Sequence, residues 1–186
     1  MSTRIDAATP ARLTELADVA ARTFPLACPP SVAPQDVAAF IEENLSPGRF
    51  GDYLDDPDRA VLTATEGERI IGYAMVVRGL PGDDAVGDGD DDDGDGALAV
   101  MTRPAVQLSK LYVLPEAHGA GVSAALISAA LQQAGNLGGA CVWLGVNQHN
   151  QRAQRFYTKH GFTVTGTRTL RLGCHREHDY VMVRPA

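Results

Sequence analysis

The sequence predicts an α/β (α+β) fold: a mixed, mostly antiparallel central sheet of about seven strands, with about four helices. Residues 107–113 alternate as a strand and lead through a glycine-bearing turn into a helical pattern at 122–129. A second apolar run, at 140–146, precedes another helical pattern around Phe156. The remaining strand-like runs form pairs joined by short turns, at 60–65 with 69–77 and at 162–172 with 178–184.

The N-terminal part of the chain is predicted to hold one strand and mainly helices. Residues 4–7 are expected to form the strand, and Pro10 suits the first position of a helix. Pro25, with the two prolines that follow it, is expected to end that helix. A second helix is expected from Pro34, and a third short piece around residues 50–54.

Residues 81–96 form an acidic, glycine-rich segment that cannot bury enough apolar surface to offset the cost of ordering. We therefore expect a flexible loop that expands a hairpin between two strands of the sheet. A calcium loop is the alternative, because Asp88, Asp90 and Asp92 have the alternate spacing of calcium ligands. Asp93, however, stands where that loop needs glycine, and no helical pattern flanks the segment. No metal site is predicted.

Composition narrows the classes of protein. A chain of 186 residues suits a single domain over residues 1–186. The net charge of −7 without a basic stripe argues against nucleic acid as a partner. No apolar run reaches membrane-spanning length, and the first residues lack the apolar core of a signal peptide. The three scattered cysteines include no C-x-x-C pair, so we expect a reduced, cytoplasmic protein.

The turn at residues 118–121 could bind an anionic group through its backbone. The first N–H groups of a helix have no partner inside the helix, and the helix dipole makes that end positive. Gly119 and Gly121 lack Cβ atoms, so a phosphate could reach these backbone donors. The stretch matches neither G-x-x-x-x-G-K-[ST] nor G-x-G-x-x-G with an acidic residue about 20 positions later. A helix entry that merely tolerates glycine is the alternative.

This stretch resembles motif A of the GCN5-related N-acetyltransferases (GNAT family), Q/R-x-x-G-x-G/A after a strand that ends L-Y-V-x-P. Residues 111–115 match that strand end. His118 stands where the family has Gln or Arg, and Ser123 stands where it has Gly or Ala. Residues 147–162 resemble the family's motif B, N-x-x-N-x-x-A-x-x-F-Y-x-K-x-G-F. Together the two motifs cover roughly residues 106–162, in the family's order.

The resemblance implies a GNAT-like fold and an N-acetyltransferase that uses acetyl-CoA as cosubstrate and no metal. In this family acetyl-CoA lies where two neighbouring strands diverge, here residues 107–113 and 140–146. The strand end would pair with the pantetheine amides, the turn would cradle the pyrophosphate, and the motif B asparagine would touch the pantetheine arm. The residues so implied are Leu111, Tyr112, Val113, His118, Gly119, Ala120, Gly121, Val122, Ser123, Ala124 and Asn150.

The implied partner is an amine acceptor, which the resemblance leaves open between an antibiotic, a polyamine, an amino acid and a protein N-terminus. In the resembled family the region around residues 34–54 covers the acceptor site. A homodimer is also compatible with the resemblance.

Tyr157 is the candidate general acid, because the family's motif B tyrosine faces the sulfur of CoA. A phenol titrates near pH ~10, so it is protonated at neutral pH and can donate a proton to the leaving thiolate. A core tyrosine on a helix face is the alternative interpretation. The N–H group of Val113 could polarise the thioester carbonyl.

The general base is left open. Gln107 occupies a position where many relatives carry glutamate, and an amide cannot accept a proton at neutral pH. Removal of the proton through water is one alternative. A non-catalytic acyl-CoA-binding regulator of the same fold is the second functional hypothesis, and the two motifs argue against an unrelated α/β domain. The side chains considered as bases are Glu42, Glu43, His175, His178 and Asp179.

Overall fold

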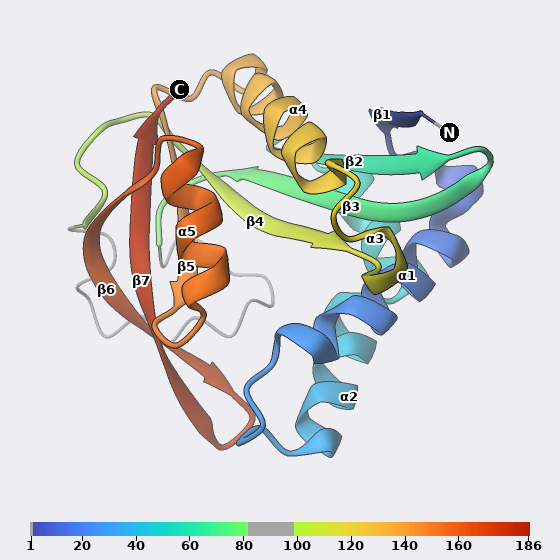
Figure 1. Ribbon diagram of the computed structural model, residues 1–186, viewed down its shortest axis with the longest axis horizontal. Coiled ribbons are helices and arrows are strands. Elements are labelled where there is room, and N and C mark those ends of the chain that lie inside the picture. Colours follow the sequence, from blue (N-terminus) through green and yellow to red (C-terminus); the bar gives the residue numbers. More distant parts are fainter. Residues whose placement is uncertain (1, 82–98) are drawn as a thin grey trace. The chain divides into compact units, whose positions relative to one another are not determined.

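The computed structural model describes residues 2–81 and 99–186. Within them, seven strands form one sheet in the order β1-β2-β3-β4-β5-β7-β6 (Figure 1). The strands are β1 (Thr3–Ala7), β2 (Arg59–Glu66), β3 (Arg69–Arg78), β4 (Ala105–Val113), β5 (Cys141–Asn147), β6 (Thr163–Leu172) and β7 (His175–Pro185). The helices are α1 (Leu13–Ala27), α2 (Pro34–Asn44), α3 (Pro47–Asp55), α4 (Val122–Asn136) and α5 (Gln151–Lys159), with 3-10 segments η1 (Pro10–Arg12) and η3 (Pro115–Ala117).

The pairing of the strands confirms the predicted mixed sheet. The pairs β1–β2, β2–β3, β5–β7 and β6–β7 are antiparallel, and β4–β5 is parallel. The described residues contain five α-helices where about four were expected, because the piece around residues 50–54 is a full helix, α3.

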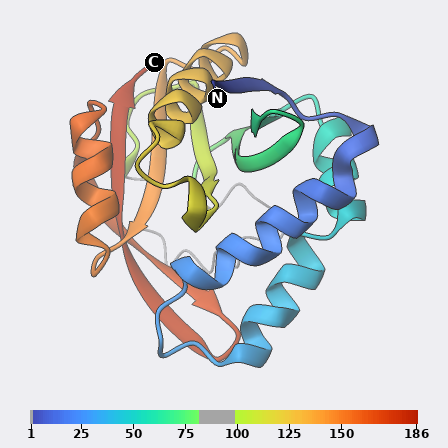
Figure 2. The ribbon, with the colours of Figure 1, turned by 45° about the vertical axis from the view of Figure 1, so that its right-hand side comes forward.

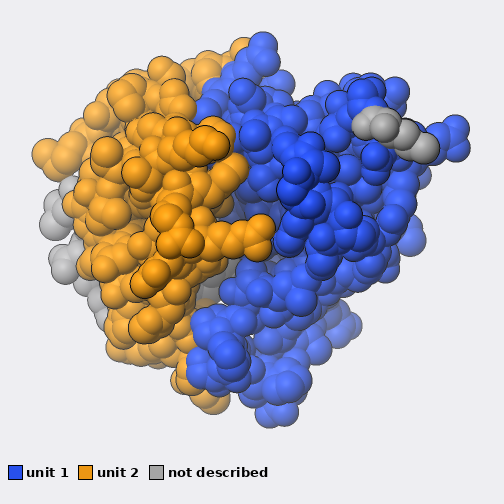
Figure 3. All heavy atoms as spheres, viewed as in Figure 1, with its two compact units in different colours: residues 1–77, 108–133 blue, residues 78–107, 134–186 orange. Residues whose placement is uncertain are grey.

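The chain divides into two compact units (Figure 3). Unit 1 comprises Met1–Val77 with Leu108–Gln133, and unit 2 comprises Arg78–Gln107 with Ala134–Ala186. The single domain over residues 1–186 stays a prediction. The predicted acidic loop, apart from Pro81, lies outside the described residues, as do Asp88, Asp90, Asp92 and Asp93.

The helices α1, α2 and α3 belong to unit 1, and Figure 2 shows α1 and α2 side by side. They contact each other through aromatic rings, since Phe24 of α1 stacks on Phe40 of α2 at 4.5 Å between ring centroids. The prediction that Pro25, Pro29 and Pro30 end this helix is confirmed only in part: Pro25 lies inside α1, which continues to Ala27 and ends before Pro29 and Pro30. Because Pro25 stands in the last turn, its missing N–H and its ring disturb only the final residues of the helix.

Gly72 of β3 lies close to the backbone of β4 within unit 1. A Cβ atom at Gly72 would lie 2.8 Å from the carbonyl oxygen of Tyr112. On the other neighbouring strand the register of β2 against β3 shifts between Ala64 and Thr65. Gly72 therefore combines a close backbone approach to β4 with an adjacent irregularity in the β2–β3 pairing.

In unit 2, α5 runs alongside β5 and β7 in both ribbon views (Figures 1 and 2). Trp143 of β5 is 1% exposed, and its indole N–H donates to the carbonyl of Gly79 at 2.8 Å, so it is a core residue. The β6–β7 hairpin turns at Gly173, which has φ +60°. Its second strand starts at His175, three residues earlier than the sequence pattern indicated.

Candidate active site

The turn between β4 and α4 leaves space beside its backbone. Gly119 has φ +83° and Gly121 has φ +77°, a conformation that residues with a Cβ rarely adopt. A Cβ atom built on either glycine would meet no other atom within 4 Å. A ligand can therefore approach this backbone without meeting a side chain.

The same turn presents a row of backbone donors. Among the described residues, the six N–H groups of residues 119–124 have no hydrogen-bond acceptor. The next N–H group, that of Ala125, donates to the carbonyl of Gly121 at 3.1 Å. Since α4 begins at Val122, the positive end of its dipole adds to these donors. The row, residues 119–124, has the donors and the charge to bind an anionic group.

His118, just before this row, is hydrogen-bonded to the end of β4. Its ring Nε2 lies 2.9 Å from the carbonyl oxygen of Val113. Because a carbonyl can only accept, Nε2 must carry the proton of this bond. The backbone N–H of His118 donates to Pro115 at 3.2 Å. Both donors are thus used inside the protein, and the backbone N–H groups without an acceptor begin at Gly119.

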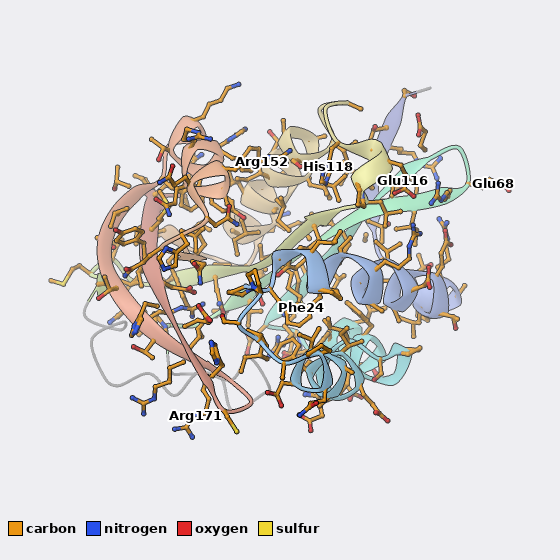
Figure 4. The ribbon with its side chains drawn as sticks, turned by 60° about the horizontal axis from the view of Figure 1, so that its bottom comes forward. Phe24, Glu68, Glu116, His118, Arg152 and Arg171 are labelled. Carbon is orange, nitrogen blue, oxygen red and sulfur yellow. The ribbon has the colours of Figure 1, made fainter. Side chains whose placement is uncertain are left out.

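Glu116 links the segment between β4 and α4 to other elements of unit 1. Figure 4 shows Glu116 near His118 on the chain after β4. Its Oε1 accepts from Arg69 of β3 at 2.6 Å and from Arg22 of α1 at 3.2 Å. Its own backbone N–H and then Arg69, with a smaller contribution from Arg22, lower the pKa of Glu116 to about 2, although desolvation acts in the opposite direction. Sequence reasoning missed this cluster, because its members lie 47 and 94 positions apart and form no local pattern.

The strand residues implied to pair with pantetheine lie at the end of β4. Leu111 and Tyr112 are half-buried and Val113 is buried. The Tyr112 ring lies 5.8 Å from that of Tyr73 on β3. Unit 1 therefore brings the end of β4 and the row of residues 119–124 together, separated only by the η3 segment. Gln107, at the other end of the strand, is 4% exposed.

Another group of unit 1 is formed by side chains of α1, α2 and β4. The stacked rings of Phe24 and Phe40 are half-buried, and Figure 4 shows Phe24 on α1. The Lys110 ammonium of β4 lies 5.9 Å from the centre of the Phe40 ring. This places a cation and two aromatic rings next to each other on unit 1.

Asn150, in unit 2, is the N-cap of α5. Its Oδ1 accepts from the backbone N–H of Ala153 at 3.1 Å, which satisfies one of the free donors of the helix end. The side-chain amide of Asn150 makes no hydrogen bond to a described residue through its NH₂ group. The side chain can therefore cap the helix and still donate to a ligand.

Tyr157, also on α5, is half-buried among aromatic rings. The centroids of Phe156 and Phe162 lie 5.3 and 5.9 Å from its own. Its hydroxyl makes no hydrogen bond within the part of the chain that the structure describes. Burial raises the pKa of Tyr157 to about 12, so the phenol holds its proton over the whole neutral range.

The candidate bases fall in both units. Glu42 and Glu43 are exposed on α2 of unit 1. Asp179 on β7 of unit 2 is buried and lies 3.5 Å from the Arg168 guanidinium. Burial raises the pKa of Asp179, although the Arg168 charge acts in the opposite direction. Asp179 is therefore engaged in a buried ion pair.

The remaining candidates lie on the same strand. His178 is exposed, and its Nδ1 is 3.5 Å from Thr169 Oγ1. His175 lies 3.5 Å from Glu177, a residue that the sequence did not single out. Glu177 accepts a hydrogen bond from the Asn147 side chain at 3.0 Å. Asn147 is the first asparagine of motif B, so Glu177 is one hydrogen bond away from the start of that motif.

Two general observations apply to residues 2–81 and 99–186. They contain no group of three or more His, Cys, Asp or Glu side chains arranged to hold a metal ion. None of their helices combines the length and apolar character that a bilayer span requires.

Comparison with known proteins gives a consistent result. The model of the acetyltransferase (GNAT) family matches residues 16–162. Uncharacterized N-acetyltransferases of Mycobacterium tuberculosis (strain H37Rv) and Mycobacterium bovis are each 56% identical over 170 residues, which cover 91% of this chain and 95% of the relative.

Solved structures share the fold. The PaiA N-acetyltransferase of Thermoplasma acidophilum, in complex with coenzyme A, superposes with a TM-score of 0.73 at 18% identity over the full length of both chains. A histone acetyltransferase HPA2 and related acetyltransferase from Corynebacterium glutamicum gives a TM-score of 0.69 at 20% identity, covering 100% of this chain and 97% of the other.

Proposed function

This chain belongs to the GNAT acetyltransferase family, and we propose that it transfers the acetyl group of acetyl-CoA to a primary amine of a small molecule, peptide or protein. The observation that carries this proposal is the row of backbone N–H groups at residues 119–124, beside two glycines with open space around them. A neighbour of the same fold binds coenzyme A, whose pyrophosphate is the kind of anion that such a row accepts.

The cosubstrate would be held by both motifs. In this proposal residues 119–124 bind the pyrophosphate, and backbone groups of Leu111, Tyr112 and Val113 pair with the pantetheine amides. The carbonyl of Val113 already accepts from His118, so its N–H is the group left for the ligand or for the thioester oxygen. Asn150 donates to the pantetheine arm through its NH₂ group.

The reaction proceeds in a ternary complex. The neutral amine nitrogen attacks the thioester carbon, the C–N bond forms and the C–S bond breaks. The nitrogen releases its proton to a base or to water, and the Tyr157 hydroxyl gives its proton to the thiolate. The pKa of Tyr157, about 12, means that the phenol carries the proton that this step needs at neutral pH, while it also makes the phenol a weaker acid than an ordinary tyrosine.

An acceptor screen tests the proposal. The protein would be incubated with acetyl-CoA and a panel of polyamines, amino acids, aminoglycosides and peptides with free N-termini, and release of CoA thiol would be followed. We expect acceptor-dependent thiol release and a mass increase of one acetyl group on at least one amine. The Gly121→Asp variant, which should no longer bind acetyl-CoA, is the control for thioester hydrolysis.

A non-catalytic regulator remains the second candidate, because the buried Gln107 offers no base. Calorimetry separates the two functions. Tight acetyl-CoA binding without turnover on any acceptor would support the regulator, whereas absence of binding would contradict both.

A further inference from the structure

The connection between β5 and α5 in unit 2, residues 148–150, is fixed at its first end by the side chain of Asn147. The Nδ2 group of Asn147 donates to Glu177 Oε2 of β7 at 3.0 Å, and its Oδ1 accepts from the backbone N–H of His149 at 2.9 Å. An amide has a donor end and an acceptor end, and here each end has its own partner. The Asn147 side chain is therefore held in one orientation.

The backbone of the connection is bonded as well. The carbonyl of Asn147 accepts from the N–H of Asn150 at 2.9 Å and from Gln154 Nε2 at 3.1 Å. Gln154 also donates to the carbonyl of Gln148 at 3.0 Å, and the N–H of Gln148 donates to the carbonyl of His178 at 3.0 Å. Because loops without such bonds are usually mobile, this network gives the short connection a defined shape.

Glu177 links this network to β7. Asn147 lies opposite Asp179 in the β5–β7 register, so Glu177, two residues away on β7, reaches Asn147 diagonally on the same face of the sheet. The Glu177 side chain is 16% exposed, and its other oxygen, Oε1, lies 3.5 Å from His175 Nε2. A hydrogen bond to a carboxylate is stronger than one between neutral groups. Among the bonds of Asn147, the one to Glu177 is thus the best suited to fix its side chain.

The network ends at a donor that has no partner in the part of the chain that the structure describes. Asn150 Oδ1 caps α5 by accepting from the N–H of Ala153 at 3.1 Å, while the NH₂ group of the same amide makes no hydrogen bond there. The cap fixes the plane of the amide, and the bond from the Asn150 N–H to Asn147 fixes the backbone that carries it. A donor that is fixed before binding loses less conformational entropy when a ligand arrives.

We propose that Glu177 is a positioning residue for the cosubstrate: through Asn147 it fixes the connection that carries Asn150, so that the Asn150 NH₂ group can donate to the pantetheine arm of acetyl-CoA. This inference rests on the proposed function, which assigns the pantetheine contact to Asn150. In this proposal Glu177 itself contacts neither the cosubstrate nor the reacting atoms.

A double-mutant cycle on acetyl-CoA affinity, measured by calorimetry, tests whether Glu177 acts through Asn150. Asn150→Ala removes one hydrogen bond to the ligand and should weaken binding about three- to tenfold. Glu177→Ala should weaken binding about two- to fivefold in the wild-type background and less than about 1.5-fold in the Asn150→Ala background. Equal losses in both backgrounds, or no loss in the wild-type background, would overturn the proposal.

Glu177→Gln is the conservative variant, because its amide oxygen can accept from Asn147 as the carboxylate does. Its affinity for acetyl-CoA should lie within about 1.5-fold of the wild type. Thr169→Ala, on the neighbouring strand of the same hairpin, is the control for a general effect on the hairpin and should also bind like the wild type. If Glu177→Gln or Thr169→Ala lost as much affinity as Glu177→Ala, the bond to Asn147 would not be the cause, which would contradict the proposal.

Reversing the direction of the bond is a stricter test. Asn147→Asp puts a second carboxylate against Glu177 and should weaken acetyl-CoA binding at least as much as Glu177→Ala. In the double variant Asn147→Asp/Glu177→Gln the new amide can donate to the new carboxylate, so affinity should return to within about twofold of the wild type. A double variant that binds no better than Asn147→Asp would refute the role of this bond.

Turnover separates this inference from the proposed function. At saturating acetyl-CoA, kcat of Glu177→Ala should stay within about twofold of the wild type while KM for acetyl-CoA rises, since only cosubstrate binding is changed. A fall in kcat without a rise in KM would contradict the positioning role. A wild type that binds acetyl-CoA, with losses from Glu177→Ala and Asn150→Ala that simply add, would refute the positioning role alone. A wild type that does not bind acetyl-CoA would refute the proposed function as well.

Discussion

The imidazole Nε2 of His118 and the carbonyl oxygen of Val113 lie 2.9 Å apart, so the side chain that opens the glycine turn is bonded back to the end of β4. His118→Ala removes this bond and should let the turn sample other conformations. One hydrogen bond contributes about 0.5–1.5 kcal/mol, so acetyl-CoA affinity should fall about two- to tenfold in calorimetry.

His118→Gln is the matched variant for this bond, because a glutamine amide can also donate to the Val113 carbonyl. It should recover most of the lost affinity. Equal losses in the alanine and glutamine variants would mean that the imidazole acts in another way than as a donor to the strand.

The Gly121→Asp variant tests the row of backbone donors. It adds a Cβ atom at φ +77° and a negative charge where the pyrophosphate is proposed to lie. We expect acetyl-CoA affinity to fall at least tenfold, and the Tm to fall as well, because a residue with a Cβ is strained at this positive φ even where the surrounding space is open. Gly121→Asn makes the same demand on the backbone without the charge, so it should bind more tightly than Gly121→Asp. Unchanged affinity in a folded Gly121→Asp protein would refute the pyrophosphate assignment.

Glu116 should make part of the stability acid-sensitive. Its pKa is about 2 in the folded protein, below the ordinary value of 4.5, so its ionised form is favoured by folding. The resulting stabilisation is present above about pH 4.5 and is lost as the pH falls toward 2. The Tm difference between wild type and Glu116→Gln should therefore be largest near neutral pH and vanish near pH 2. Because the cluster is exposed, the difference should also shrink in 1 M salt. A difference that is independent of pH would contradict this.

Gly72→Ala should strain the contact between β3 and β4. The new Cβ would lie 2.8 Å from the Tyr112 carbonyl oxygen and 3.2 Å from Val113 Cγ2. Overpacking of this kind costs about 1–3 kcal/mol, which denaturant unfolding would detect. Gly51→Ala in α3 is the control, since its Cβ would meet only Leu13, at 3.6 Å, and alanine favours the helix by about 0.5–1 kcal/mol. If both variants were equally stable, the close approach at Gly72 would be incorrect.

Tyr157→Phe removes only the hydroxyl and should leave acetyl-CoA affinity unchanged. Turnover should fall on the order of 10²-fold, the low end for loss of a general acid. Tyr180→Phe, on β7 of the same unit, is the control and should be close to wild type. Normal turnover of Tyr157→Phe at every pH would show that this tyrosine is a packing residue.

The pKa of Tyr157 also fixes the pH dependence. Since it is raised from 10 to about 12, the phenol should impose no alkaline limb on turnover below about pH 11. The stabilisation from the neutral phenol is present below pH 10 and is lost between pH 10 and 12. An alkaline limb near pH 9 that disappears in Tyr157→Phe would contradict the raised pKa.

The sequence predicted the order of strands and helices well, because alternating and helical apolar patterns identify elements that bury one face. It did not predict that α1 continues past Pro25 to Ala27. A proline in the last turn of a helix disturbs only the final residues, and the sequence pattern does not show whether a proline stands in that turn or after it. It also predicted too short a β7, because the early residues of that strand, from His175 to Glu177, are polar.

The site was predictable only in part. The glycine turn and motif B are local in sequence, so the candidate residues at 119–124, Asn150 and Tyr157 could be named from it, and their roles stay predictions. The bond from His118 to Val113 depends on one ring orientation, and the ion pairs of Glu116 join residues far apart in the chain. Such features are set by tertiary structure and leave no local pattern.

Because the donors at residues 119–124 belong to the backbone, the chemistry of this turn is largely independent of which side chains it carries. In a deep mutational scan selected for acetyl-CoA binding, Ala120 and Ala124, both exposed, should therefore accept most substitutions. Gly119 and Gly121 should tolerate few substitutions, because both have a positive φ that glycine adopts much more readily than other residues. Binding by the turn would then depend on the residue type at these two positions, and the other positions of the turn could change in sequence without loss of binding.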